Sequence, residues 1–543
     1  MGLVRRACSM GAAVSLLGVV WAVGASDGPA GAAPASPIPG TVPTLVQGAT
    51  DLGAAAQQPL AVTLSLPLRN QAGLTSLIAG LTNPSSPTYH QFLTPASFAS
   101  QFSPTSDTVN AVTGWASSAG LTVTSVSSNR TLVTVTGSPS QLGQAFGVTF
   151  DSYRETNGQT FISNTQTATV PAALAGDVSS IVGLSTLGQV QLAPVAAPTG
   201  SVSFPSSYGP KDFWSFYNAP ASQTGAGQTI AVLAEGDLSS PKADLASFEQ
   251  TYGLPTVPWT TIPTGAASTD TSGNDEWDLD TQYSTGLAQD VSSLLVYDAP
   301  SLSDPDILAE MNKWVTDDQA KQANFSAGEC ELLADSDGFL TSNDQVLEQG
   351  VAQGQTLFTA AGDTGAFCPL LVGVNGVPAG LPGTNYPASS PYAVGVGGTT
   401  ILGGPAPLGE IGWYAGGGGQ SLLEAEPAYQ SSVGGSNLGL RRGVPDVAFD
   451  ADPDSGFNVI VGGQPTVVGG TSGSSPSWLG IWARTQAAHG GNLGFANDTI
   501  YAEPTTSFND IEIGTNVPYP ATPGYDYVTG RGTPNIAAFI AAA

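Results

Sequence analysis

The sequence predicts an α/β protein with two domains, in which a doubly wound parallel sheet follows a smaller α+β domain. Three observations predict this. The chain has 543 residues, 41% of them hydrophobic, which is enough for more than one sizeable core. From residue 208 onward, apolar strands alternate with helical segments, a rhythm typical of a parallel sheet covered by helices. Residues 46–188 have a different pattern, in which two strands follow one another directly.

In the smaller domain, the pattern predicts the order strand, helix, strand, strand, helix, strand, with two successive helices in the first helical place. This is the order of a split βαβ, ferredoxin-like fold. The expected elements are strands at 61–68, 121–126, 131–137 and 148–154, and helices at 74–81, 109–119 and 140–147.

In the larger domain, the apolar runs read as buried strands and the periodic segments between them as helices. Functional groups in such a sheet gather at the carboxyl ends of the strands. The expected strands are 229–235, 292–299, 355–363 and 392–398, and the expected helices are 242–252 and 307–317.

The ends of the domains have the composition of processing segments. Residues 1–25 place Arg5 and Arg6 before an apolar run that ends in small residues, which indicates a signal peptide cut after Ala25. Residues 26–45 form a Pro/Ala/Gly spacer, and 189–207 an exposed linker with a processing site. No later stretch is apolar enough to span a bilayer. We therefore expect a secreted, soluble, extracellular protein.

The charge balance is strongly acidic. The chain has 13 Lys and Arg against 42 Asp and Glu, a formal net charge of -29. Nucleic acids and anionic membranes are therefore excluded as partners. A fold with so few basic groups can depend little on salt bridges that acid would break, so we expect tolerance of acid.

Three cysteines bear on the redox compartment. Cys8 leaves with the signal peptide, and Cys330 and Cys368 remain. An even pair in an oxidising compartment predicts one disulfide bond, and two unrelated free thiols are the alternative.

The stretch GGTSGSSPSWLGIWA, residues 469–483, contains a candidate nucleophile. A strand-like run precedes it, and apolar residues at helical spacing follow it. A strand, a tight Gly turn and a helix present a hydroxyl at a positive helix end, which indicates Ser472. A flexible Gly/Ser linker is the alternative.

A histidine cannot serve this serine. The chain has only His90, in the smaller domain, and His489, at the far end of the same helix. A separation of about 17 residues in a helix is roughly 25 Å, which excludes a Ser-His-Asp triad.

Carboxyl groups are the remaining candidates for the base. Glu276 and Asp280 have helical i,i+4 spacing, and coupled carboxyls can share a proton in acid. Asp363 ends an apolar strand within a Gly-bracketed turn, where its protonated form could donate a hydrogen bond to an oxyanion. Considered alone, each could equally be an ordinary acidic turn.

Taken together, these residues resemble the sedolisin family, the serine-carboxyl peptidases, in its kumamolisin-like form. The resemblance covers nearly the whole chain after the signal peptide. The N-terminal domain resembles the family's activation prodomain, including SPTYHQFLTPASFASQF at 86–102. The other motifs, in family order, are EWDLD (276–280), AAGDTG (360–365), YPASSPYAVGVGGT (386–399), RGVPDVAFDADP (442–453) and GGTSGSSP (469–476).

The resemblance implies a subtilisin-like fold and a role for each candidate residue. Ser472 would be the nucleophile, Glu276 the general base, Asp280 its hydrogen-bonded partner and Asp363 the oxyanion donor. The protein would be an endopeptidase or tripeptidyl peptidase that cleaves unstructured protein in acid. It would be made as a zymogen whose own prodomain acts as an intramolecular inhibitor and chaperone.

The resemblance also implies one structural calcium ion near the C-terminus. Asp510 and Asp526 would bind through carboxylates, and Ile511, Thr522 and Gly524 through backbone carbonyls. Hard oxygen ligands suit Ca²⁺, although two plain turns with capping Asp residues are the alternative.

One departure from the family concerns the strand that meets the substrate. Some members have Ser-Trp-Gly where this chain has Ser326, Ala327 and Gly328. The missing Trp prevents a detailed transfer of subsite preference or of an extended hydrogen-bond network.

Two readings outside catalysis remain open. One is a catalytically silent homologue that acts as a binding or surface protein, and the other is a Ser/Gly-rich adhesion or carbohydrate-binding protein. Filled catalytic positions argue against the first, and a separate α+β domain against the second. We expect a monomer.

Overall fold

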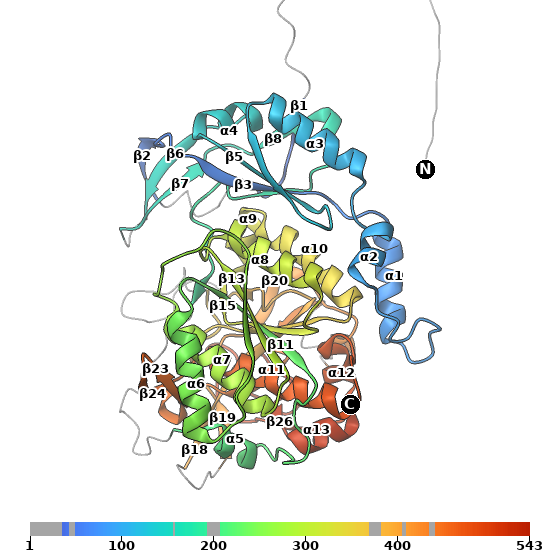
Figure 1. Cartoon of the computed structure of the whole chain (residues 1–543), viewed down its shortest axis with the longest axis vertical. Coiled ribbons are helices and arrows are strands. Elements are labelled where there is room, and N and C mark those ends of the chain that lie inside the picture. The colour runs from blue at the N-terminus through green and yellow to red at the C-terminus, as the bar shows by residue number, and fades with distance from the viewer. Residues whose placement is uncertain are drawn as a thin grey trace, which may run out of the picture.

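The computed structural model describes residues 35–42, 49–155, 158–192, 207–368, 382–403, 409–433 and 440–543. The predicted signal peptide, most of the spacer, and residues 193–206 of the predicted linker lie outside these ranges. Figure 1 shows a smaller N-terminal domain resting on a larger domain, with an arm of two helices reaching down one side of the larger domain.

The larger domain is built on an eight-stranded sheet, parallel except where its last strand joins. The strand order is β12-β13-β11-β14-β16-β18-β19, and β22 also pairs with β18. The strands are β11 (Thr229–Glu235), β12 (Trp259–Pro263), β13 (Ser293–Ala299), β14 (Gln322–Phe325), β16 (Thr356–Ala360), β18 (Ala393–Leu402), β19 (Gly409–Gly412) and β22 (Val447–Asp450).

Helices cover both faces of this sheet, as predicted. Along β11, Val232 belongs to one core cluster and Ala231 and Leu233 to another, because alternate side chains point to opposite faces. The helices are α5 (Pro210–Phe216), α6 (Ser239–Tyr252), α7 (Asn274–Ala288), α8 (Asp304–Asp317), α9 (Glu331–Ser336), α10 (Phe339–Ala352), α11 (Thr471–Ala488), α12 (Ala496–Ala502) and α13 (Ile536–Ala542).

Short strands build the loops at the edges of the larger domain. They are β15 (Ala327–Cys330), β17 (Asn385–Tyr386), β20 (Gly419–Ala425), β21 (Arg441–Val444), β23 (Phe457–Val461), β24 (Gln464–Val468), β25 (Phe508–Asn509) and β26 (Thr533–Pro534).

The N-terminal domain has an antiparallel sheet in the order β4-β5-β3-β9, which is the ferredoxin-like order. Its elements are β1 (Ala35–Pro37), β2 (Thr50–Ala54), β3 (Leu60–Ser65), α1 (Gln71–Thr82), α2 (Pro95–Gln101), α3 (Ser106–Ser118), β4 (Thr122–Val126), β5 (Leu132–Gly137), α4 (Pro139–Phe146), β6 (Phe150–Arg154), β7 (Thr160–Asn164), β8 (Thr169–Pro171), β9 (Ser180–Val182) and β10 (Gln191–Leu192).

One strand of the prediction was assigned to the wrong sheet. The segment 148–154 was expected to be the fourth strand, but β6 pairs with β2 and β7 in a separate sheet. The fourth strand is β9, whose three residues are too few to show an alternating pattern. Helix α2 was not predicted from periodicity either.

The N-terminal domain contacts α8 and α10 through neutral hydrogen bonds. The amide of Asn129 donates to Asn312 Oδ1 at 2.7 Å and to Gln349 Oε1 at 2.8 Å. The Gln345 side chain accepts from the Leu68 N–H at 3.1 Å and donates to the Leu66 carbonyl at 2.9 Å. These four groups do not titrate, but the Glu348 carboxylate of α10 also accepts from Gln71 Nε2 at 2.7 Å, and burial raises its pKa.

The segment 189–192 was expected to be exposed linker, and this was wrong. Val190 is buried and its N–H donates to the Leu302 carbonyl, while Gln191 and Leu192 form β10, which pairs antiparallel with β15. The edge of β15 offers backbone groups that an extended chain satisfies regardless of its side chains, so composition gave no signal.

The arm of the N-terminal domain, residues 71–102, is anchored to the larger domain by the Phe92 ring, which packs against two glycines. A Cβ on Gly354 or Gly494 would lie within 2.7 Å of the Phe92 ring, so these glycines make room for Phe92. The Leu93 N–H donates to the Ala352 carbonyl at 3.0 Å.

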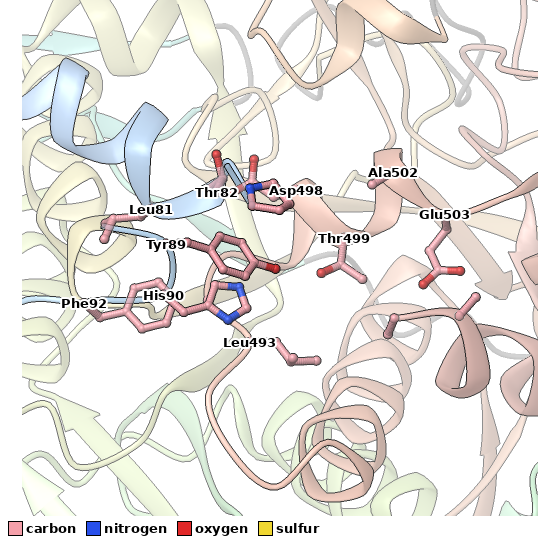
Figure 2. Close-up of a pocket in the computed structure, with 14 residues that line it drawn as sticks. Leu81, Thr82, Tyr89, His90, Phe92, Leu493, Asp498, Thr499, Ala502 and Glu503 are labelled. Atoms are coloured by element: carbon pink, nitrogen blue, oxygen red, sulfur yellow. The ribbon is translucent and has the colours of Figure 1, made fainter. Parts of the chain in front are cut away.

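Figure 2 shows His90 beside Tyr89, in the pocket between this arm and helix α12. The two rings stack with centroids 3.8 Å apart, and burial lowers the pKa of His90. The other titratable side chains that line the pocket are those of Tyr89, Asp498 and Glu503.

We expect acid to loosen the arm. Because the docked arm favours neutral imidazole, His90 supports docking above its ordinary pKa of about 6.5, and this support is lost as pH falls through the lowered pKa. Burial raises the pKa of Asp498 to about 7 and also raises the pKa of Glu503, so both carboxyls gain protons on acidification and offer His90 little counter-charge. Their protonation favours the docked arm, so the loosening is assigned to His90 alone.

Hydrogen exchange of residues 84–93 in the intact chain, corrected for intrinsic rates, should therefore show falling protection from about pH 7 to pH 5. In His90→Asn, which tolerates the left-handed φ of 53° and carries no charge, this fall should disappear. An equal fall in both chains would contradict the assignment.

Candidate active site

Helices α7 and α11 pack closely and form the frame of the site. A Cβ on Gly480 would lie 2.7 Å from the Ala288 nitrogen and from the Ser284 carbonyl oxygen, so only glycine allows this approach. The contact fixes the position of the acidic first turns of α7 relative to the start of α11.

Ser472 is the second residue of α11, as the strand, Gly turn and helix pattern predicted. The helix begins after β24 and the turn Gly469–Gly470, and Pro476 lies within it. The Ser472 side chain is 1% exposed, and its Oγ donates a long hydrogen bond of 3.4 Å to the Ser326 carbonyl.

Glu276 and Asp280 lie one turn apart on α7 and are both buried. Burial and the neighbouring Asp280 carboxyl raise the pKa of Glu276, while the Ser472 hydroxyl lowers it as a hydrogen-bond partner. Neither Glu276 oxygen has a partner in ordinary hydrogen-bond geometry within the described part of the chain. The two carboxyls form a coupled pair that favours retaining a proton.

Asp363 lies in the turn after β16, close to the start of α11. Its Oδ1 accepts from the Thr471 N–H at 2.8 Å and from Thr471 Oγ1 at 2.7 Å. Its Oδ2 is buried without a partner among the described residues, and a Cβ on Gly470 would lie 2.5 Å from this atom. Burial raises the pKa of Asp363 to about 6, so in acid Oδ2 can carry a proton and donate it.

The structure thus brings together all four residues singled out from the sequence. The two histidines are elsewhere: His489 caps the far end of α11, 2.8 Å from the Ile540 carbonyl oxygen, and His90 lies in the arm. Sequence reasoning missed the polar side chains behind Asp280, which are Asn324, Ser326 and Ser475. The cluster of serines in 472–477 was the signal that could have indicated Ser475.

Strand β15 begins next to Ser326, whose carbonyl contacts Ser472 Oγ, and the edge of β15 is paired with β10 at the end of the N-terminal domain. Gln191 lies opposite Gly328 and Leu192 opposite Ala327. Cys330, at the end of β15, forms the predicted disulfide with Cys368, with their Cα atoms 5.0 Å apart. Leu187, which precedes β10, packs in the same hydrophobic cluster as this disulfide. The disulfide therefore supports the segment that leads into β10.

A second acidic group, not expected from the sequence, lies beside this strand. Asp304, Glu329 and Asp337 are buried, with carboxylate oxygens within 4.8 Å of one another. A Cβ on Gly188 would lie within about 2 Å of both Asp oxygens, so the backbone of the N-terminal domain closes over them.

The two loops predicted to hold calcium lie against each other. The Gly524 N–H donates to Asp510 Oδ2 at 2.9 Å, and Asp526 accepts from the N–H groups of Thr522 and Val528 at 2.8 Å. Burial raises the pKa of Asp526, and no cationic side chain acts on it. Two carboxylates in adjoining loops, for which no ion pair is found among the described residues, are oxygen donors of the kind that Ca²⁺ prefers.

No helix in the described ranges combines the length and the apolar character that a membrane span requires.

Comparison with known proteins agrees with this geometry. Residues 47–187 match the family model described as the Pro-kumamolisin activation domain. Sedolisin from Pseudomonas sp. (strain 101) is 33% identical, over 88% of this chain and 86% of that protein. Xanthomonalisin from Xanthomonas sp. (strain T-22) is also 33% identical, over 90% of this chain, which spans 66% of that relative.

A solved structure, Pseudomonas sedolisin (serine-carboxyl proteinase) complexed with two molecules of pseudo-iodotyrostatin, superimposes with a TM-score of 0.59 at 34% identity. The superimposed region covers 62% of this chain and 98% of the solved chain. The shared fold, the matched activation domain and the identity along the chain lead to one conclusion. This chain belongs to the sedolisin family of serine-carboxyl peptidases, with an N-terminal prodomain.

Proposed function

We propose that this protein is a secreted, acid-active serine endopeptidase, made as a self-processing zymogen. The observation that carries the proposal is the convergence of Ser472, Glu276, Asp280 and Asp363 at the start of α11, beside a strand occupied by the prodomain. Secretion rests on the signal-like residues 1–25 and on the disulfide.

In the proposed mechanism, Ser472 Oγ attacks the peptide carbonyl while its proton passes to Glu276. Asp280 holds the other proton of the pair, so the transfer leaves both carboxyls protonated. Glu276 then gives its new proton to the leaving amine as the C–N bond breaks, and a water that loses a proton to the same pair hydrolyses the acyl-enzyme and frees Ser472. The proton on Asp363 Oδ2 is donated to the developing oxyanion, a role that requires acid because an ionised carboxylate would repel that charge. The substrate would add an extended segment to the edge of β15, as the prodomain strand does.

The prodomain strand favours an endopeptidase over the tripeptidyl peptidase alternative. Gln189 bridges to Ser303, Val190 donates to Leu302, and Gln191 and Leu192 pair with β15. Four successive residues, 189–192, thus lie along Ser303, Leu302 and β15, and the chain extends past them in both directions. A tripeptidyl peptidase would instead need this end of the cleft to be closed.

Calcium would tie together the two C-terminal loops. Asp510 and Asp526 would bind it through carboxylates, and Ile511, Thr522 and Gly524 through carbonyls. The ion would contribute stability by neutralising carboxylates in the loops that follow β25 and precede β26, and would take no part in the chemistry.

Self-processing is tested by intact mass. After a shift from pH 7 to about pH 4, the wild-type chain should lose a fragment that ends between residues 189 and 207, because Ser472 cleaves the linker. Ser472→Ala should stay whole. If both chains stay whole, the catalytically silent homologue is correct, and if both are cut, another protease is responsible.

The oxyanion role is tested by Asp363→Asn. The amide nitrogen would take the place of Oδ2 and donate at any pH, while the amide oxygen would still accept from Thr471. Because the Asp363 pKa is about 6, wild-type kcat/KM should fall above about pH 6, and the ratio of variant to wild type should rise there.

Asp363→Ala is the control, since below about pH 6, where the wild-type donor is protonated, it should lose roughly 100- to 1000-fold in kcat, as loss of one oxyanion donor does. If the profiles of wild type and Asp363→Asn fall together above pH 6, Asp363 is not the donor.

The calcium site is tested by chelation. Removing an ion present at about 100 times its Kd should cost about 2.7 kcal/mol and lower the melting temperature by several degrees, with recovery on adding Ca²⁺. Asp526→Asn should abolish this response, whereas the exposed Asp290→Asn should retain it. An unchanged wild-type melting temperature would contradict the site.

A further inference from the structure

Behind Asp280, three buried side chains form a hydrogen-bond chain that ends at its carboxylate. Ser475 Oγ donates to Asn324 Oδ1 at 2.6 Å, and Asn324 Nδ2 donates to Ser326 Oγ at 3.0 Å. Ser326 Oγ in turn donates to Asp280 Oδ1 at 2.6 Å. Asn324 and Ser475 are fully buried and Ser326 is 1% exposed, so bulk water does not compete for these bonds.

The direction of the chain follows from its chemistry. The amide nitrogen of Asn324 can only donate, so the Ser326 hydroxyl accepts there and must direct its own proton onward. Its acceptors are Asp280 Oδ1 at 2.6 Å and the Ser472 carbonyl at 3.3 Å, of which the carboxylate is nearer. With the amide reversed, Ser326 would face two acceptors with a single proton, and Asp280 would compete for it.

The hydrogen-bond chain joins residues that are distant in the sequence and become neighbours only when the protein folds. Asn324 lies on β14, Ser326 between β14 and β15, and Ser475 on α11, one turn after Ser472. Ala327 follows Ser326 in this protein and carries no polar side chain. The support of Asp280 therefore comes from the β14 side of the site.

We propose that Asn324, held by Ser475, is a positioning residue that acts through Ser326 to keep the Glu276–Asp280 pair anionic in acid. The inference rests on the proposed function. Before it accepts the Ser472 proton, the pair carries one proton and one negative charge. Below the apparent pKa of the pair, both carboxyls are protonated, and the Ser472 proton has no acceptor.

Donors that point at Asp280 Oδ1 stabilise the negative charge and so extend the working range towards acid. Burial raises the pKa of Asp280, and the Ser326 and Asn324 side chains act in the opposite direction. Asp280 Oδ2 has no partner in the described ranges, which leaves the Ser326 side as its observed source of donors.

The variants Asn324→Leu and Ser475→Ala test this inference in the mature enzyme. The first removes the amide and keeps the branching of the side chain at Cγ, and the second removes only the far hydroxyl that orients the amide. In both, the acid limb of kcat/KM should move to higher pH, with little change on the alkaline side. A shift of one pH unit for Asn324→Leu means an about tenfold loss below the limb. Ser475→Ala should shift less.

Ser474→Ala is the matched control. Ser474 lies in the same turn of α11 as Ser475, and its buried Oγ donates to the Asp450 carbonyl at 2.8 Å. It takes no part in the hydrogen-bond chain that leads to Asp280. Its acid limb should coincide with the wild type. If Asn324→Leu and Ser475→Ala lower the plateau and leave the acid limb in place, these residues are only structural and the inference is overturned.

A second measurement needs no activity. Infrared titration of buried carboxyl groups, with Glu276→Gln to assign the band of the pair, should show protonation at higher pH in Ser475→Ala than in the wild type. If the protein has no peptidase activity and this shift is still observed, the proposed function fails, but the role of the hydrogen-bond chain is supported. If the two titrations coincide, the hydrogen-bond chain does not act on the carboxyl pair.

Discussion

Carboxyl groups buried without cationic partners shape both the stability and the chemistry of this protein. The described residues contain three ion pairs, and only Arg442–Asp446 is fully buried. Burial raises the pKa of Glu235 to about 7, of Glu424 to about 8 and of Asp278 to about 9. A carboxyl whose pKa is raised by folding contributes stability below its unfolded pKa of about 4 and loses it as pH rises through the folded value. The fold is therefore suited to acid, by protonated carboxyls as well as by the scarcity of salt bridges.

The same constraint explains how a serine can be activated without histidine. An imidazole would be charged throughout the acid range, whereas a buried carboxyl pair keeps a proton and one negative charge there. Glu276 and Asp280 lie inside a helix pair that Gly480 holds close, so their mutual repulsion cannot be relieved by separation. In the proposed mechanism, Asp363 uses the same burial for the opposite purpose, because burial raises its pKa to about 6 and its protonated form would be the donor.

Buried titratable groups lie at two contacts of the prodomain, and acid has opposite effects on these two contacts. Gly188 closes over Asp304 and Asp337, and burial raises the pKa of both carboxyls, so acid favours this contact. His90 is buried in the arm with a lowered pKa, so acid opposes that contact. On this balance, acid opposes the His90 contact in the arm and favours the contact of Gly188 with the two aspartates. The proposed self-processing would therefore release β10 from β15 by cutting the chain rather than by simple dissociation of the strand.

How far the sequence predicts this molecule depends on whether a feature is local. The turn of Asp363 and the Gly turn before Ser472 could be predicted, because each is a short pattern with its own turn chemistry. The helix of Glu276 and Asp280 could not be decided from their i,i+4 spacing alone, because an acidic turn fits that spacing equally. Strand β9 could not, because three residues carry no period, and the pairing of β10 with β15 is made by backbone groups that any sequence provides. Asn324 and Ser475 are 151 positions apart, and the packing of β14 against α11 alone makes them neighbours. An Asn in a strand is ordinarily unfavourable. In a buried strand that cost needs compensation, and here the two hydrogen-bonding partners of Asn324, Ser326 and Ser475, supply it. A misfit in local propensity at Asn324, beside the serine cluster around Ser475, is therefore the trace that this part of the site leaves in the sequence.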